Sequence, residues 1–493
     1  MTPTLDSLEP SLLWKHFLAL SAIPRPSKSE AAVAAHVEET ARRLGLPCRR
    51  DAAGNLVVTK PGTPGREAEP ATILQGHLDM VCEKNSATAH DFTKDPIRLV
   101  PDGEWVKADG TTLGADNGIG VAAALAVLES KDVSHGPLEC LFTIDEETGM
   151  TGAYGLEPGF LAGDRMLNLD TEEEGAVYVG CAGGMDTVAR TKVSLVPPSP
   201  GTRAYRVSFT GFRGGHSGVD IHEGRANAIK LLARFLFAGI ERLGLEVAAL
   251  EGGSKRNAIP REAFAVVYAD PGREDELKAA VAKLQADLKA ELGPIEPNLA
   301  LALEAASGAP GKVFSASDAA RVVGYLHASP HGRLAMSPDI PDLVQTSTNL
   351  AIVATAGDEV TVSMSHRSSV ESAKLDVGAQ VRALSALAGF AAEQGEGYPG
   401  WKPDVTSPLL SQAKQVHARL FGAEPAVKAI HAGLECGIIG EKYPGLMTIS
   451  FGPTIQNAHS PDEKVHVPSV GRFWTYLVAM LAEPPARVTA KAA

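Results

Sequence analysis

Four short apolar runs in this chain end close to a histidine or an acidic residue. They span residues 71–75, 138–144, 165–169 and 446–451. Runs of this length predict buried strands, and helical patterns lie between them, for example at 29–44 and 118–128. This alternation predicts an α/β fold with a mixed, largely parallel sheet flanked by helices. In such folds, loops at the carboxyl edge of the sheet bring polar side chains together.

The chain has 493 residues, which is too long for one ordinary core and predicts more than one domain. Between residues 186 and 398 the strand patterns change. The segments 205–209, 264–268 and 360–364 alternate as strands with one exposed face, and 226–243 is an amphipathic helix pattern. We therefore predict an inserted α+β domain at 186–398, with the first domain built from 1–185 and 399–493.

The ends of the helix at 29–44 carry recognisable signals. Ser27 or Ser29 is expected to cap its N-terminus, and Gly45 is expected to end it. These signals place the helix just before the first predicted strands.

Charge and composition exclude several classes of function. The net charge of −13 disfavours nucleic acid and anionic membrane surfaces, because both require a basic footprint. No apolar run approaches the roughly 18–20 residues of a membrane span, and the N-terminus lacks a signal-peptide layout. The five cysteines are scattered and lack close pairs, which favours a reducing cytoplasm.

Side chains that bind divalent metals follow the apolar runs. The candidates are His77, Asp116, Glu146, Glu147, Asp170 and His459. Zinc hydrolases use imidazole and carboxylate ligands, and a two-metal site needs a bridging carboxylate. Asp79 follows His77 at a spacing that lets a carboxylate orient an imidazole. Of the adjacent acids Glu146 and Glu147, one suits a metal ion and the other suits proton transfer from water.

Asp116 and two other features of the sequence also have a structural interpretation. Asp116 suits an N-cap, and its glycine-rich surroundings suit a turn; a phosphate-binding loop would also need a lysine and a hydroxyl residue, which are missing. The acidic run 172–174 is expected to be solvated, and His466 is expected to be structural.

Taken together, these motifs resemble the aminoacylhistidine dipeptidase family, within the carnosinase-like zinc metallopeptidases. The shared segments run nearly from end to end and include 77–79, 113–120, 146–150, 170–175, 180–184, 214–218, 256–263, 398–401, 431–437 and 459–463. The resemblance implies a zinc-peptidase catalytic domain of the phosphorylase/hydrolase-like type, carrying the inserted domain as a lid.

The resemblance also implies roles for the candidates in the catalytic domain. Asp116 bridges two metal ions, with His77 and Asp170 on one ion and Glu147 and His459 on the other. Glu146 is the general base, and Asp79 orients His77. The peptide bond between Asp116 and Asn117 is expected to be cis.

The resemblance also implies residues that contact the substrate. By resemblance, His216 polarises the scissile carbonyl, Asn257 and Arg367 hold the substrate or its carboxylate, and Gly433 and Glu435 contact substrate. The family carries an acidic residue two places before the arginine, and this chain does not. His366, next to Arg367, is therefore a rival for the functional position.

The implied reaction is hydrolysis of unblocked dipeptides, carnosine-like ones included, with a preference for a C-terminal histidine. Zinc is the expected metal, and cobalt or manganese would fit the same ligands. A broader di- or tripeptidase, or an N-acyl-amino-acid deacylase of the same clan, is the alternative. A homodimer formed through the lid stays open, as does a non-catalytic protein that keeps the fold for binding.

Overall fold

The computed structural model describes residues 5–484, which form two compact units. The first unit contains, of the described residues, 5–180, 403–429 and 434–484. The second contains 181–402 and a short return of the chain at 430–433. The sequence had indicated an insertion at 186–398 and had given no sign of the short return.

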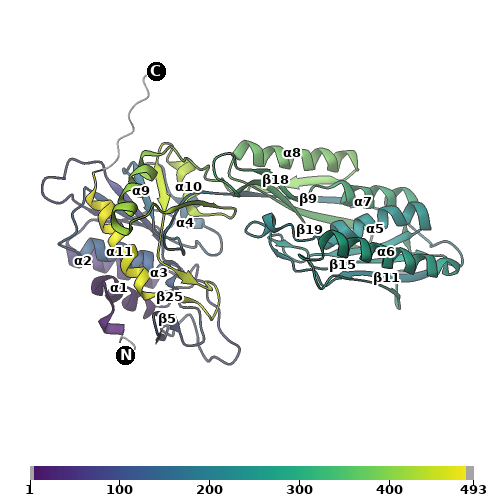
Figure 1. The fold of residues 1–493 in the computed structure, drawn as a ribbon, viewed down its shortest axis with the longest axis horizontal. Coiled ribbons are helices and arrows are strands. Elements are labelled where there is room, and N and C mark those ends of the chain that lie inside the picture. Colours follow the sequence, from purple (N-terminus) through teal and green to yellow (C-terminus); the bar gives the residue numbers. More distant parts are fainter. Residues whose placement is uncertain (1–4, 485–493) are drawn as a thin grey trace, which may run out of the picture. The chain divides into compact units, whose positions relative to one another are not determined.

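An eight-stranded mixed sheet is the centre of the first unit (Figure 1). Its strand order is β1-β2-β6-β3-β7-β23-β8-β22. The bounds are β1 Cys48–Arg50, β2 Leu56–Lys60, β3 Thr72–His77, β6 Leu138–Thr143, β7 Arg165–Asn168, β8 Ala176–Cys181, β22 Ala426–Ile430 and β23 Met447–Ser450. The four central strands β6, β3, β7 and β23 are parallel, and β1, β2 and β8 pair antiparallel. The carboxyl ends of the four parallel strands therefore share one edge.

Seven helices accompany this sheet in the described part of the first unit. They are α1 Ser11–Ser21, α2 Ala31–Leu44, α3 Ala115–Glu129, α4 Thr151–Gly155, α9 Pro408–Phe421, α10 Glu435–Lys442 and α11 Val467–Ala482. Helix α3 is buried along almost its whole length, which explains its alanine-rich sequence. Within residues 5–484, no helix is both long and apolar enough to cross a membrane.

The predicted serine cap of α2 is wrong. Glu30 occupies the N-cap position, and its carboxylate accepts hydrogen bonds from the backbone N–H groups of Lys28 and Asp145. Ser27 lies three residues before the cap position, and its hydroxyl donates to Asp79 at 2.7 Å. The predicted end of the helix is confirmed, since Gly45 adopts a left-handed conformation with φ 68°.

A small four-stranded sheet in the first unit frames the loop that carries His459. Its order is β24-β25-β5-β4, with β4 Leu99–Asp102, β5 Trp105–Ala108, β24 Ile455–Gln456 and β25 Lys464–His466. Strands β24 and β25 pair antiparallel, so residues 457–463 form the connecting loop. The sequence analysis did not anticipate this sheet.

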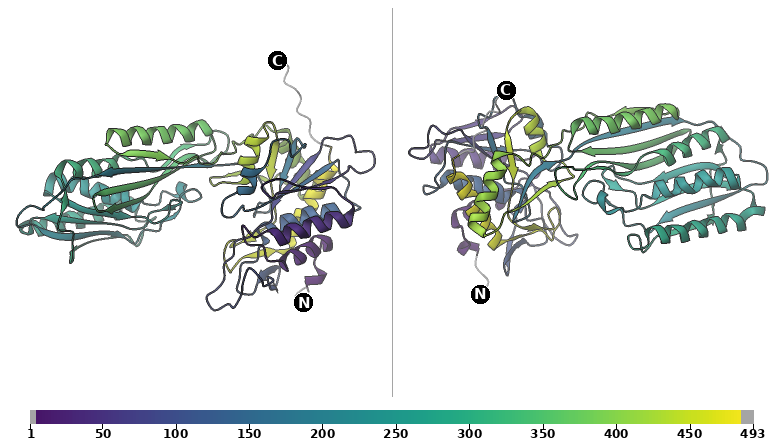
Figure 2. Two further views of the ribbon diagram at one scale, coloured as in Figure 1. Left: turned by 180° about the vertical axis from the view of Figure 1, so that it is seen from behind. Right: turned by 45° about the horizontal axis from the view of Figure 1, so that its top comes forward.

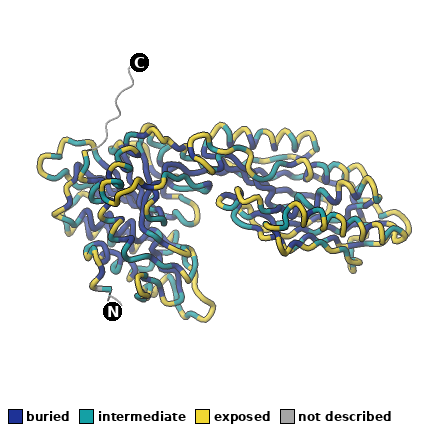
Figure 3. Tube along the Cα trace, in the orientation of Figure 1, coloured by how far each residue is buried: buried dark blue, intermediate teal, exposed yellow. Residues whose placement is uncertain are grey.

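The second unit is built on a large antiparallel sheet with its own core (Figures 2 and 3). Its strands are β9 Gly183–Lys192, β11 Arg203–Thr210, β13 Glu246–Gly252, β15 Ala263–Ala269, β16 Ala300–Ala305, β18 Gly332–Met336, β19 Val344–Ala356, β20 Glu359–Ser368 and β21 Ala391–Gln394. Short pairs are formed by β10 Leu195–Val196 with β17 Val313–Phe314, and by β12 Gly215–His216 with β14 Ala258–Ile259. Helices α5 Ala228–Leu243, α6 Glu274–Leu292, α7 Ala316–Ala328 and α8 Glu371–Leu387 lie on one face of the sheet. The expected α+β character of the insertion is confirmed.

Candidate metal centre

The histidine and carboxylate candidates of the first unit converge at the carboxyl edge of the parallel strands. Three groups have ligand atoms that all lie within 4.8 Å of one another. They are His77, Asp116 and Asp170; His77, Glu146 and Glu147; and Asp116, Glu147 and His459. Loops that are far apart in the chain therefore meet at one place, as the positions of the strand ends predicted.

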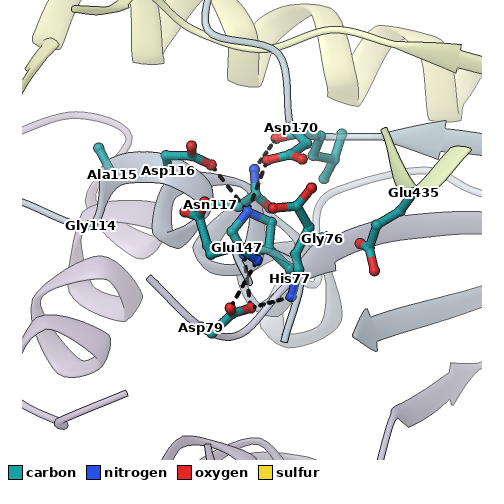
Figure 4. A network of polar contacts seen from close by, with 12 residues as sticks. Gly76, His77, Asp79, Gly114, Ala115, Asp116, Asn117, Glu147, Asp170 and Glu435 are labelled. Carbon is teal, nitrogen blue, oxygen red and sulfur yellow. Dashed lines mark hydrogen bonds and ion pairs between the residues drawn. The ribbon is translucent and has the colours of Figure 1, made fainter. Parts of the chain in front are cut away.

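Asp116 lies between the two histidines. Its Oδ1 is 3.1 Å from Nε2 of His77, and its Oδ2 is 3.1 Å from Nε2 of His459. Asp170 approaches the same nitrogen of His77 at 3.3 Å, and Glu147 approaches that of His459 at 3.1 Å. Asp79, Asp116 and Asp170 surround the His77 ring (Figure 4). The two oxygens of the Asp116 carboxylate therefore face different histidines, Oδ1 toward His77 and Oδ2 toward His459.

The backbone around Asp116 departs from the helix that follows. Asp116 and Asn117 have non-helical dihedral angles inside α3, and the peptide bond between them is cis. The Asn117 side chain donates to the carbonyl of Leu169 at 2.8 Å, which ties this turn to the loop that carries Asp170. The helix begins after Gly114, so the interpretation of Asp116 as its N-cap is wrong.

Asp79 holds both an imidazole and a loop. It is fully buried, and its Oδ1 lies 3.3 Å from Nδ1 of His77. Its carboxylate also accepts the backbone N–H groups of Glu146 at 3.1 Å and Glu147 at 3.2 Å. Burial opposes its charge, but hydrogen bonds from His77 and Ser27 lower the pKa of Asp79 to about 2. Asp79 is therefore an ionised acceptor that points His77 Nε2 at the site.

The carboxylates strongly favour protonated histidines in the absence of bound cations. Hydrogen bonds to Asp116 and Glu147 raise the pKa of His459 to about 11. Burial works against a charged His77, yet Asp170, Asp116 and Asp79 raise the pKa of its imidazole well above the ordinary value. The site therefore attracts positive charge.

Several acids at the site are difficult to ionise together. Burial raises the pKa of Glu146 well above its ordinary value, and nearby carboxylates add to the shift. Burial and the charge of Asp116 raise the pKa of Asp170 and of Glu172 to about 8. Glu172 is mostly buried, so the prediction of a solvated loop is wrong at this residue. Glu173 and Glu174 instead pair with Lys428 and Arg472.

This donor set fits divalent cations. Imidazole nitrogen and carboxylate oxygen are ligand atoms that zinc prefers, and two of the three groups share the carboxylate of Asp116. The Oε1 atom of Glu147 is buried and has no hydrogen-bond partner among residues 5–484. An unpaired buried carboxylate oxygen is costly, and a cation would compensate it.

Glu435 lies in the first unit beside this centre, and its side chain is buried. It is 2% exposed, and its Oε2 accepts from Gln75 at 2.7 Å and from Thr143 at 2.6 Å. Burial raises the pKa of Glu435 to about 7. These contacts attach Glu435 to β3 and β6, and its expected contact with substrate stays a prediction.

The remaining predicted residues belong to the second unit. His216 Nδ1 accepts the backbone N–H groups of Gly218 and Val219, so the neutral ring carries its proton on Nε2. Burial and the charge of Arg367 lower the pKa of His216, which favours this neutral form. Asn257 is exposed, and its carbonyl accepts from Ser217 at 2.8 Å.

Arg367 is 8% exposed and donates to the hydroxyl of Tyr398 at 2.9 Å. The Tyr398 ring also lies against Gly433, where a side-chain carbon would come within 2.9 Å of it. His366 is fully buried between the hydroxyls of Thr187 and Thr348, each at 2.8 Å, and is structural. His466 packs on Trp105 and is structural too, as expected.

Comparison with known proteins adds the family. Residues 73–483 match the family described as Peptidase family M20/M25/M40. The chain belongs to this peptidase family. A relative from Escherichia coli K12, cytosol non-specific dipeptidase, is 44% identical over 98% of this chain and 99% of its own.

Solved structures of other proteins are similar to this chain over nearly its whole length. The aminoacylhistidine dipeptidase of Vibrio alginolyticus is 44% identical and covers 99% of both chains with a TM-score of 0.93. Aminopeptidase PepT of Bacillus cereus, at 17% identity, shares the fold with a TM-score of 0.55 over 96% of this chain and 98% of its own. The resemblance seen in the sequence and the predicted fold class are confirmed, and the chain is a hydrolase of the M20 family.

Two supporting residues near the centre were missed by sequence reasoning. Arg25 and Glu463 are buried, and both contact the backbone of the turn before Asp116. Glu463 lies within a motif used for the resemblance, but neither its type nor its spacing indicated this contact.

Proposed function

We propose that this chain is a metal-dependent dipeptidase that hydrolyses the peptide bond of unblocked dipeptides. The observation that carries the proposal is the position of Asp116, with one oxygen facing His77 and the other facing His459. The names of the two relatives at 44% identity, both dipeptidases, support the reaction class.

In the proposed site, Asp116 would hold two divalent ions, one on each carboxylate oxygen. His77 and Asp170 would hold one ion, and Glu147 and His459 would hold the other. Bound there, the ions would polarise the scissile carbonyl and make water acidic enough to act as a nucleophile at neutral pH. Zinc is the proposed metal, with cobalt and manganese as substitutes that suit the same ligands.

Glu146 moves the proton. The carboxylate of Glu146 accepts a proton from the attacking water and delivers it to the leaving amine nitrogen. Its backbone N–H is fixed by Asp79, which limits the positions that the side chain can reach. Burial and nearby acids shift its pKa upward, toward the range in which a carboxyl group can both take and return a proton.

Residues of the second unit act on the substrate in this proposal. His216 donates from Nε2 to the carbonyl oxygen as negative charge develops there. Arg367, together with Asn257, binds the C-terminal carboxylate, since a guanidinium matches a carboxylate in a bidentate manner. Gly433, which packs against the ring of Tyr398, is proposed to contact the bound substrate.

Two ranges of substrate follow from the relatives. The name of the Vibrio enzyme favours dipeptides with a C-terminal histidine, whereas the name of the E. coli relative favours a broader range of dipeptides. We propose the Xaa-His preference, and cytoplasmic action without a nucleic-acid or membrane partner. A homodimer through the second unit is compatible with this function.

A substrate panel tests the proposal. Metal-stripped protein is reloaded with zinc and offered β-alanyl-histidine, alanyl-histidine, leucyl-glycine and an acetylated amino acid, and product release is followed. Zinc-dependent release of histidine from the two free dipeptides, ahead of leucyl-glycine, is expected. Equal cleavage of all free dipeptides would replace the histidine preference with a broad one, and cleavage of the acetylated compound alone would make the chain a deacylase.

A further inference from the structure

A buried carboxylate fastens the loop of His459 to the loop of Asp116. Glu463, 2% exposed, accepts four backbone N–H groups of the turn that leads into α3. Oε2 binds those of Leu113 at 2.7 Å and Gly114 at 3.0 Å, and Oε1 binds those of Ala115 at 2.8 Å and Asp116 at 3.3 Å. A charged acceptor on four buried donors is a strong attachment.

His459 depends on that attachment. Its side chain is 52% exposed, so apart from the contacts of Nε2 with Asp116 and Glu147 its position depends on the conformation of the loop that carries it. The loop is short and closed on itself: the N–H of Glu463 donates to the carbonyl of Ser460 at 3.0 Å, and the Ser460 hydroxyl donates to that of Asn457 at 2.8 Å. Movement of Glu463 therefore carries His459 with it.

The same turn is held from the other side by Arg25. This guanidinium, 3% exposed, donates to the carbonyls of Leu78 at 3.0 Å and Asp79 at 2.8 Å, and also to that of Gly114. A side chain at Gly114 would collide with it, because an added carbon would lie 2.6 Å from Nη2. Arg25 thus joins the Asp116 turn to the loop of His77 and Asp79.

We propose that Glu463 is a positioning residue for the ion pocket of Asp116, Glu147 and His459, and that Arg25 is its counterpart for the pocket of His77. The proposal rests on the proposed function in assuming that ions occupy both pockets. It goes beyond that function because it assigns one buried positioning residue to each pocket. It therefore predicts that the ion affinity of each pocket can be lowered separately.

The substitution Glu463→Gln tests this assignment. An amide of the same shape has one acceptor oxygen and directs its NH2 group at backbone N–H donors, so the four contacts cannot all persist. Loss of supporting contacts around ligands typically weakens metal binding by about 10- to 100-fold. We expect that loss for one of the two ions, with a smaller change for the ion held by His77.

The neighbour Asp462 provides a matched control. It is exposed, and Asp462→Asn removes the same charge one residue away without touching the turn. Zinc is titrated into metal-free wild type, E463Q, D462N and R25K against a chromophoric chelator, and hydrolysis is measured at each free zinc concentration. E463Q should bind one ion normally and one weakly, and it should regain turnover at high zinc. R25K should weaken mainly the other ion, while D462N should match wild type.

The outcomes separate this inference from the proposed function. If wild type binds no ions, the proposed function and this inference are both contradicted. If wild type binds two ions and E463Q binds both with wild-type affinity, or loses both equally, only the inference falls. A fold defect is excluded by comparing the thermal unfolding of the metal-free proteins. If E463Q does not fold, E463D takes its place, and since its carboxylate is one methylene shorter, it should weaken the same ion.

Discussion

The carboxylate of Asp79 accepts a hydrogen bond from the backbone N–H of Glu146 at 3.1 Å. One buried acid thereby fixes the start of the 146–147 loop, while its other contact orients the imidazole of His77. Asp79 therefore positions both the proposed general base, Glu146, and a proposed metal ligand, His77. A substitution that displaces the Asp79 carboxylate should affect proton transfer and metal binding together.

Asp79→Asn should lower both kcat and metal affinity. The amide keeps one acceptor oxygen but cannot serve His77 and two backbone N–H groups together. We expect a loss of about 10- to 100-fold in zinc affinity and a further loss in kcat at saturating zinc. Steady-state kinetics at several free zinc concentrations measure the two effects. Full recovery of kcat by zinc would show that Asp79 does not position Glu146.

Removing the metal should destabilise the first unit. The acids of the centre are buried close together, and cations offset their repulsion. An ion that binds only the folded state adds about 2.7 kcal/mol when its free concentration is roughly 100 times its Kd. Thermal unfolding of metal-free protein with and without added zinc measures this. Asp116→Asn, which disturbs both pockets, should abolish the zinc-dependent shift, whereas an unchanged shift in that variant would place the ions elsewhere.

Glu435 should make the stability of metal-free protein depend on pH. Burial raises its pKa to about 7 in the folded chain, above the ordinary value in the unfolded chain. The folded state therefore binds the proton more tightly, so this stabilisation is complete at low pH and is lost as pH rises through about 7. Glu435→Gln keeps an acceptor for Gln75 and Thr143, and it should flatten the fall in stability between pH 5 and pH 8. Denaturant unfolding across that range checks the slope, and an equal slope in both proteins would contradict the assignment.

His216 and His366, both in the second unit, should behave differently when each is replaced. His366→Ala leaves a cavity and two hydroxyls without their partner, and should cost about 2 to 4 kcal/mol of unfolding free energy. His216→Ala should leave stability nearly unchanged and lower kcat instead. Denaturant unfolding and kinetics of both variants decide between them. If H366A were stable and inactive, His366 would be the functional histidine.

Much of the centre could be predicted because its ligands follow strand ends. His77 ends β3, and Glu146 and Asp170 follow the ends of β6 and β7 within three residues, so local pattern and parallel topology agree. The alternation predicted for β15 is confirmed, whereas β20 alternates only over its first four residues and is buried beyond them.

Other features depend on tertiary contacts that no local pattern reveals. Ser27 has the type of a helix cap, but it lies three residues before the cap position, and its hydroxyl donates to Asp79, 52 residues on. Glu172 stands in an acidic run that suits a solvated loop, yet it is buried beside Asp116. Glu463 lies about 350 residues from the turn that it holds, so only the folded chain shows its role.

Glu146→Gln tests the central claim most directly. Glu146 is proposed to move the proton without holding an ion, so the variant should still bind two zinc ions per chain. Its kcat should fall by about 10²- to 10⁴-fold, the usual contribution of a general base. The adjacent control Glu147→Gln should instead lose affinity for one ion. Zinc stoichiometry and single-turnover hydrolysis of alanyl-histidine are measured on the same samples. Two bound ions with a strongly reduced rate in E146Q is the predicted result, and a near wild-type rate with both ions bound would contradict the account.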